Sequence, residues 1–183
     1  FRTLLRQYGD SQLMPRVLFN LGDAFYNLKE YDSSRVYYQR VIREFPSSLL
    51  VADALSGLQY TYAAQGKPEG ALDEIERVMR ERPAGAPEED LFLKKGDIQF
   101  AQGNFAGAIG DYQRVLAMKP AQTVKAKALY QLGRAYEQEE NPLRAATFYE
   151  QALSEAPDSE AAAQAALALG LAHMKAKHDG QSV

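Results

Sequence analysis

Residues 126–157 read AKALYQLGRAYEQEENPLRAATFYEQALSEAP, and this stretch decides the fold. Its first half carries apolar or small side chains at steps of three, one and three residues, which places them on one face of a helix. Its second half repeats this with steps of four and three residues and ends on a proline, which terminates a helix. The stretch therefore predicts two helices joined by a short turn. The positions are Leu129, Leu132, Gly133, Tyr136, Ala145, Tyr149, Ala152 and Pro157.

The same pattern occurs four times in the chain. Pro46, Pro83, Pro120 and Pro157 each follow the previous one by 37 residues. A period in this range is typical of a solenoid of stacked two-helix units. The positions that precede the first three prolines are Leu18, Leu21, Gly22, Phe25, Ser34, Tyr38 and Val41; Leu55, Leu58, Gln59, Tyr62, Ala71, Ile75 and Val78; and Phe92, Lys95, Gly96, Gln99, Ala108, Tyr112 and Val115.

This pattern resembles the tetratricopeptide repeat, W-x2-L-G-x2-Y, then A-x3-F, then P. The tryptophan position holds Leu or Phe, Gln59 replaces a small residue, and Lys95 and Gln99 replace apolar ones. The period also exceeds the usual 34 residues. The resemblance implies an all-α fold, a right-handed α-solenoid of antiparallel helix pairs (a tetratricopeptide superhelix).

The register gives the expected boundaries of the repeats. The pattern also continues past both ends, which indicates a fragment of a longer protein that begins inside the second helix of a preceding repeat. The final segment is expected to form a fifth first helix that caps the solenoid. The ranges are 1–14 for the preceding half-repeat, 15–51, 52–88, 89–125 and 126–162 for the four repeats, and 163–183 for the capping helix and tail.

Several local features follow from the alignment. Small residues such as Gly22 and Ser34 should let the two helices of a repeat cross closely. Three extra residues after each proline amount to about one helical turn, so the next first helix should begin a turn early, with Ser48 and Ser159 as N-caps. Lys95 and Gln99 should make the first helix of the third repeat the least well packed. The tight turns between paired helices are expected at Gly66, Gly103, Asn104 and Asn141.

Composition excludes several functions. The chain has 183 residues, no cysteine and a net charge of −3, so disulfides and thiolate metal sites are absent and bulk charge does not favour nucleic acid. No apolar stretch approaches the length of a membrane span. His173 and His178 do not share a helix face, and the glycines near Lys67 and Gly103 lack the context of phosphate or dinucleotide loops. We therefore expect no catalytic, metal or cofactor site and no membrane insertion.

Function is expected on the surface formed by the first helices, which lines the concave groove in the resembled family. Five aromatic residues there lie off the packing positions and favour partner binding. Acidic residues occupy the first three repeats and basic residues the fourth, so a partner segment with a basic stretch and an acidic or C-terminal end would fit in one orientation. The predicted groove residues are Phe19, Asp23, Tyr26, Asn27, Asp53, Tyr60, Asp90, Asp97, Phe100, Lys127, Tyr130 and Arg134.

One binding mode of the resembled family is disfavoured. Co-chaperone members grip a peptide carboxylate with Lys, Asn and Arg residues. At the matching positions only Lys127 fits, because the others are Ser56, Tyr60, Lys94 and Gln131.

The leading hypothesis is a non-enzymatic protein-interaction scaffold that binds a peptide or helix of a partner protein. The alternative is self-association into a homo-oligomer through the Ala- and Leu-rich segment 161–174, whose apolar face has no second helix behind it. The long period and the Phe45-Pro46-Ser47-Ser48 segment resemble repeats of bacterial cell-envelope proteins. That resemblance favours the bacterial periplasm or envelope, with the cytoplasm as the alternative.

Overall fold

The structure is a computed structural model that describes residues 13–81 and 88–179, with side chains described as far as Ala172. Every regular element in these ranges is an α-helix. The predicted all-α fold of repeated helix pairs is therefore confirmed. The half-repeat expected over residues 1–14 lies almost entirely outside the described residues. The chain divides into two compact units between Lys94 and Lys95, within helix α6.

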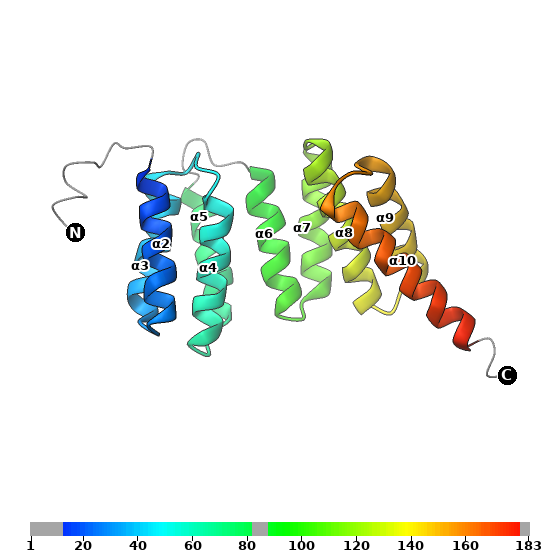
Figure 1. Ribbon diagram of the computed structural model, residues 1–183, viewed down its shortest axis with the longest axis horizontal. Helices are drawn as coiled ribbons and strands as arrows, with labels where there is room; N and C mark the ends of the chain where they lie inside the picture. The colour runs from blue at the N-terminus through cyan, green and yellow to red at the C-terminus, as the bar shows by residue number, and fades with distance from the viewer. Residues whose placement is uncertain (1–12, 82–87, 180–183) are drawn as a thin grey trace. The chain divides into compact units, whose positions relative to one another are not determined.

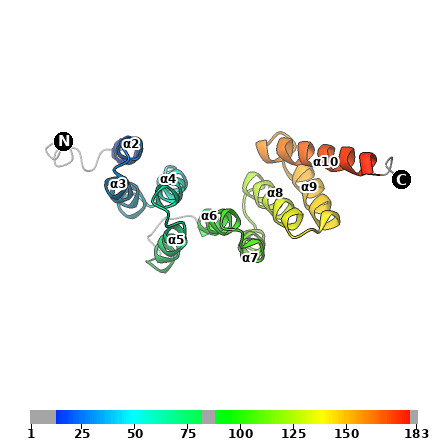
Figure 2. The same cartoon turned by 90° about the horizontal axis from the view of Figure 1, so that it is seen from below.

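Unit 1 contains two complete helix pairs. Helix α2 contacts both its partner α3 and the next first helix, α4, which in turn packs against α3 and α5. Seen from below, α2 and α4 form one layer and α3 and α5 the other (Figure 2). The bounds are α2 Met14–Asn27, α3 Tyr31–Glu44, α4 Val51–Ala64 and α5 Glu69–Glu81 (Figure 1).

Unit 2 begins with the second half of α6 and ends with an unpaired helix. Helix α8 contacts α7, α9 and α10, and α10 also contacts α9. The last helix buries Ala161, Ala162 and Ala165, so small side chains let it pack closely. The bounds are α6 Glu88–Ala101, α7 Phe105–Ala117, α8 Gln122–Gln138, α9 Pro142–Glu155 and α10 Glu160–Asp179 (Figure 1).

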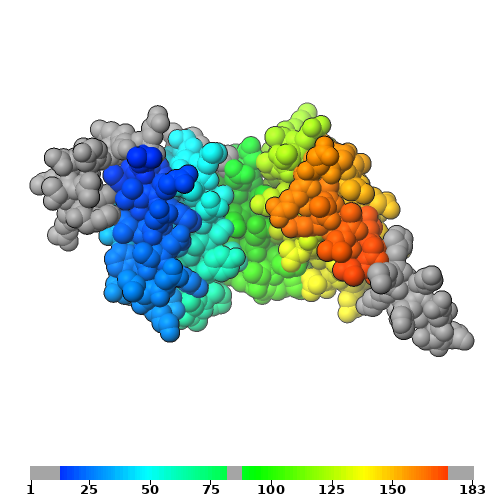
Figure 3. Space-filling model, viewed as in Figure 1, coloured from blue at the N-terminus to red at the C-terminus, as the bar shows by residue number. Residues whose placement is uncertain are grey.

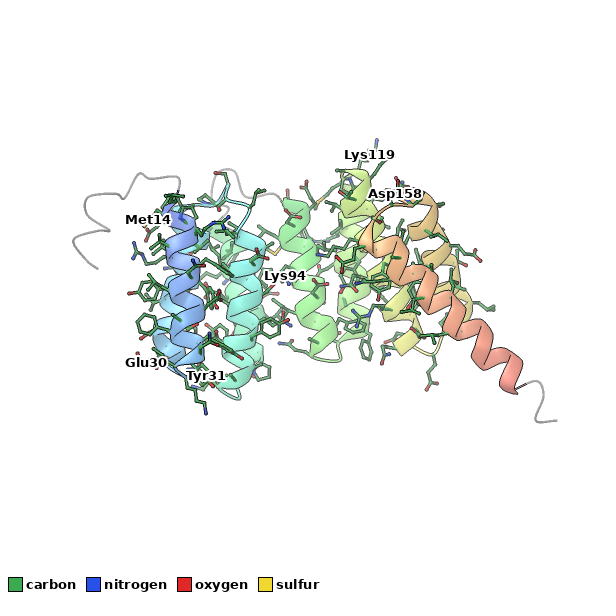
Figure 4. All side chains as sticks on the ribbon, viewed as in Figure 1. Met14, Glu30, Tyr31, Lys94, Lys119 and Asp158 are labelled. Carbon is green, nitrogen blue, oxygen red and sulfur yellow. The ribbon has the colours of Figure 1, made fainter. Side chains whose placement is uncertain are left out.

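The turns inside each helix pair share one backbone feature. The second residue after the first helix has a positive φ in all four repeats: Lys29 (62°), Gly66 (71°), Gly103 (78°) and Glu140 (54°). Glycine adopts this conformation without strain, whereas Lys and Glu pay about 1 kcal/mol or more. Figure 4 labels Glu30 and Tyr31 at the turn between α2 and α3, at the opposite end of α2 from Met14.

Asparagine caps the second helix of two pairs, as the turn chemistry predicts. The Asn104 side chain accepts a hydrogen bond from the backbone N–H of Gly107 at 3.1 Å, and Asn141 accepts one from Arg144 at 3.3 Å. Each bond satisfies one N–H that a helix start leaves without an intrahelical partner. The predicted turn residues of these two repeats are therefore confirmed.

Glycine and tyrosine form the contact that closes three of the four helix pairs. Gly22, Gly96 and Gly133 each lie against a tyrosine ring of the second helix, and an added Cβ would lie less than 3.0 Å from ring carbons. Only glycine lets the ring lie against the helix backbone. The rings belong to Tyr38, Tyr112 and Tyr149. The predicted close crossing is also visible where Ser34 Oγ donates a hydrogen bond to the carbonyl oxygen of Gly22 at 2.9 Å.

The helix starts correct part of the prediction. Ser159 caps α10 as expected, since its hydroxyl accepts a hydrogen bond from the N–H of Ala162 at 3.2 Å. Ser48 is not an N-cap, because α4 begins only at Val51 and its N-cap is Leu50. The Ser48 hydroxyl instead accepts from the N–H of Leu50 in the preceding turn. The early start holds for α8, which begins at Gln122, and not for α4.

The polar residues of α6 differ in how they are satisfied. Lys95 Nζ lies 3.7 Å from the carboxylate of Asp111 on α7, whereas Gln99 is buried and its Oε1 has no hydrogen-bond partner among the described residues. The division into two units falls beside Lys95, in the helix that the sequence predicts to be the least well packed of the first helices. Within the described residues, no helix combines the length and the apolar character needed to cross a membrane.

Candidate functional site

A hollow of about 290 Å³ opens on the surface of unit 1 between α2 and α4. These two helices lie side by side on the face shown in Figure 3, where α2 is blue and α4 is cyan. Their side chains supply most of the lining, and α3 supplies one ring. The lining residues are Phe19, Asp23, Tyr26, Tyr38, Asp53, Ser56, Gly57 and Tyr60.

Glycine and serine on α4 keep the hollow open. Gly57 has no side chain, and the ring of Tyr38 lies against its backbone so closely that a Cβ there would overlap the ring. Ser56 is small, and its hydroxyl donates to the carbonyl oxygen of Ala52 in its own helix at 3.0 Å. Tyr38 is therefore held between glycines of α2 and α4 (Gly22 and Gly57), and no large side chain of α4 covers it.

The hollow is electrostatically negative. Asp23 accepts a hydrogen bond from the Tyr38 hydroxyl at 2.6 Å, while Asp53 is exposed at the edge. Burial, followed by the hydrogen bond and charge of Asp23, raises the pKa of Tyr38. The tyrosine thus stays a protonated donor to the carboxylate, and none of the lining residues carries a positive charge.

The five predicted groove aromatics differ in exposure. Tyr60 is exposed, with 63% of its surface accessible, and the other four are half-buried. The ring of each of those four lies beside an aromatic ring of the second helix in its own pair, and the Phe100 ring also contacts Arg134 of the next first helix. The ring pairs are Phe19 with Tyr38, Tyr26 with Tyr31, Phe100 with Phe105, and Tyr130 with Tyr149, with centres 5.2 to 5.8 Å apart.

The matching surface of unit 2 is occupied by the chain's own arginine. The guanidinium carbon of Arg134 lies 4.5 Å from the centre of the Phe100 ring and 5.9 Å from that of Tyr130. Arg134 Nη1 donates to Gln131 Oε1 at 3.0 Å. The amide of Gln131 in turn donates to Asp97 at 2.7 Å.

Asp97 also accepts a hydrogen bond from Tyr112 at 3.0 Å, which repeats the pairing of Asp23 with Tyr38. Burial, followed by the charge and hydrogen bond of Asp97, raises the pKa of Tyr112. Acidic and basic groove residues therefore lie close together within unit 2. The sequence predicts the acidic residues on the third repeat and the basic residues on the fourth.

The remaining predicted groove residues lie away from both arrangements. Asn27 ends α2 and is exposed, Asp90 is half-buried near the start of α6, and Lys127 is exposed on α8. The repeat pattern predicts Tyr38 only as a residue that packs between the helices, and it predicts no role in the groove for Gly57. The sequence signal for this opening is weak: Gly57 lies two residues before Gln59, which replaces the small residue of the second repeat. Within the described ranges, no group of three or more His, Asp or Glu side chains is placed to hold a metal ion.

Comparisons with known proteins support the repeat fold. The comparison with curated proteins gave no match. Among solved structures, one titled as the crystal structure of MamA protein is 23% identical, with a TM-score of 0.51, over 79% of this chain and 74% of that one. A tetratricopeptide repeat protein from Parabacteroides merdae is 20% identical, with a TM-score of 0.57, over 91% of this chain and 62% of that one. At these identities the likeness concerns the fold alone.

Family models give the decisive match. A tetratricopeptide repeat model matches residues 60–123 and 93–160, and a second one matches residues 16–48. The matches cover more than half of the chain and include helices on both sides of the division between the units. The chain belongs to the tetratricopeptide repeat family.

Proposed function

We propose that this protein is a non-enzymatic interaction scaffold, and that the surface of its first helices binds an extended or helical segment of a partner protein. The observation that carries the proposal is the hollow between α2 and α4, which is lined by four aromatic rings, one of them the exposed Tyr60. Membership of the tetratricopeptide repeat family supports a protein partner.

The aromatic lining is suited to partner side chains. Tyrosine rings bury a large apolar area at a low cost in side-chain entropy and keep a hydroxyl for hydrogen bonding. Such residues dominate the binding energy of protein interfaces when they sit in pockets that exclude water. Tyr60 is the member of this set that partner binding would bury most.

Self-association through residues 161–174 has less support. Ala161, Ala162 and Ala165 are already buried inside unit 2, which removes much of the apolar face that this hypothesis requires. Leu167 and Leu171 remain exposed. These two leucines are four residues apart and share one helix face, but an exposed pair of this size is common on monomeric surfaces.

Site-specific photo-cross-linking tests the proposal. A photoreactive phenylalanine analogue at Tyr60 should yield a discrete protein adduct in a lysate of the source organism. The matched control is the same analogue at Val36, which is 52% exposed on α3, in the other helix layer of unit 1. Equal adducts from both positions, or none from position 60, would refute binding at the surface of the first helices.

A further inference from the structure

We infer that the hollow between α2 and α4 is a binding site for an arginine side chain of the partner segment. The inference rests on the proposed function and adds the chemistry of the group that is recognised. Asp23 and Asp53 lie at the hollow, and the rings of Phe19, Tyr26, Tyr38 and Tyr60 complete its walls.

This lining is complementary to a planar cation. A guanidinium group binds carboxylates through paired hydrogen bonds and stacks on aromatic faces. Both kinds of partner are present here, and the lining contains no Lys, Arg or His that would compete for them. Asp23 is held in place by its hydrogen bond from Tyr38, so one of the two carboxylates is already oriented.

The size of the hollow fits one side chain. Its volume of about 290 Å³ lies at the lower end of the range for small-molecule sites, roughly 300–1,000 Å³. A long side chain from an extended segment would place its charged end among the rings, while its backbone ran across α2 and α4.

In unit 2, one of the chain's own arginines occupies the corresponding place. Each lining position of unit 1 has a counterpart two periods, or 74 residues, later: Asp97 corresponds to Asp23, Phe100 to Tyr26, and Arg134 to Tyr60. There the guanidinium of Arg134 lies over the Phe100 ring and joins Asp97 through Gln131. Unit 2 thus holds an arginine in an acidic and aromatic setting.

Unit 1 keeps the acid and the rings of this setting but has Tyr60 in place of the arginine. Its cation must therefore come from another molecule. Asp53 makes the hollow of unit 1 more negative than the matching surface of unit 2, where the corresponding residue is the cation Lys127. Relative to unit 2, the hollow of unit 1 has one added negative group, Asp53, and lacks the two positive groups Lys127 and Arg134, which leaves it suited to a positively charged ligand.

Titration of the isotopically labelled chain by NMR tests the inference. The probes are the capped peptide Gly-Ser-Arg-Ser-Gly and its citrulline counterpart, which has the same shape without the charge. The arginine peptide should shift the amide signals of α2 and α4 around Asp23, Ser56 and Tyr60. It should bind weakly, and about tenfold more tightly than the citrulline peptide.

Matched variants separate the hollow from general surface charge. Asp53→Asn should weaken arginine-peptide binding about fivefold. The control Asp73→Asn removes the same charge from an exposed position on α5 that does not line the hollow, and it should leave the affinity unchanged. Tyr60→Arg places the unit 2 residue in unit 1 and should abolish peptide binding, because the chain then supplies its own guanidinium.

The outcomes distinguish this inference from the proposed function. Equal affinity for the arginine and citrulline peptides, or equal effects of Asp53→Asn and Asp73→Asn, would overturn the inference. A partner cross-linked specifically at position 60 would in that case still support the scaffold function. Shifts confined to residues outside α2 and α4 would also overturn the inference.

Discussion

The two units present the same surface of the repeat in two states, open in unit 1 and filled in unit 2. Both contain a carboxylate on the first helix that accepts a hydrogen bond from a buried tyrosine of the second helix: Asp23 with Tyr38 and Asp97 with Tyr112. Both tyrosines lie against a glycine of the first helix. The framework of the two surfaces is therefore the same.

The difference lies in the neighbouring first helix. Unit 1 places Ser56 and Gly57 where unit 2 places Tyr130 and Gln131, and the small pair leaves a hollow. In unit 2, Gln131 reaches Asp97 and supports Arg134. Repeats with one backbone pattern can thus carry an open hollow or a surface filled by the chain's own side chains, depending on a few residues.

The largest effect is expected from the glycines that both units share. Gly22→Val and Gly96→Val would each drive a side chain into a tyrosine ring and should destabilise the chain by about 3 kcal/mol. Urea unfolding followed by circular dichroism would measure both. The control Gly110→Ala, with no neighbour within 4 Å of the added Cβ, should stabilise α7 by about 0.5–1 kcal/mol. A tolerated valine at either site would show that the two frameworks are not equivalent.

A smaller effect should separate the open surface from the filled one. Arg134→Ala removes a guanidinium stacked on Phe100 and its hydrogen bond to Gln131, which should cost about 1–2 kcal/mol. Tyr60→Ala, at the corresponding position, removes an exposed ring and should change stability by no more than about 0.5 kcal/mol. The midpoints of urea unfolding would compare them. Equal losses would mean that unit 2 does not depend on its internal arginine.

The smallest effect concerns the buried hydroxyls and depends on pH. Tyr38→Phe and Tyr112→Phe each remove one hydrogen bond to a carboxylate and should cost about 1 kcal/mol at pH 7. In the folded chain the pKa of both tyrosines is raised, first by burial. Their contribution is therefore fully present below the ordinary tyrosine pKa of about 10 and is lost as the pH rises beyond it, because the unfolded chain then releases these protons more readily.

Urea midpoints from pH 7 to pH 11 would test this dependence. The difference between wild type and each Phe variant should be constant up to about pH 9 and should shrink above pH 10. A difference that grows with pH would contradict the assigned direction. The comparison with wild type is needed because the chain has 11 tyrosines, and all of them release protons near the ordinary tyrosine pKa once the chain is unfolded.

Much of the fold could be predicted from local patterns. The glycines at positions 22, 96 and 133 mark the close crossings, and Asn104 and Asn141 mark two helix caps. These features depend on residues within one helix pair, where steric rules for the backbone are strong. Ser48 was assigned wrongly because two serines follow Pro46, and their turn postpones the start of α4 to Val51.

The candidate site could be predicted only in part. Register places Asp23 and Tyr60 on the surface of the first helices, and the structure puts both at the hollow. Register assigns Tyr38 to the core, and its ring is indeed buried, yet its edge also forms part of the hollow. A buried residue can serve both roles where a glycine of the adjacent helix has no side chain to separate the ring from the hollow.

The repeat, the helix pairs and the face formed by the first helices follow from the sequence alone, because periodicity and backbone sterics act over short stretches of chain. Only the tertiary structure decided which part of that surface is open. The hollow of unit 1 and the stacked Arg134 of unit 2 depend on side chains from three helices meeting at one point. These arrangements depend on how the helices pack and on the charges that they bring together, so the sequence of one helix does not predict them.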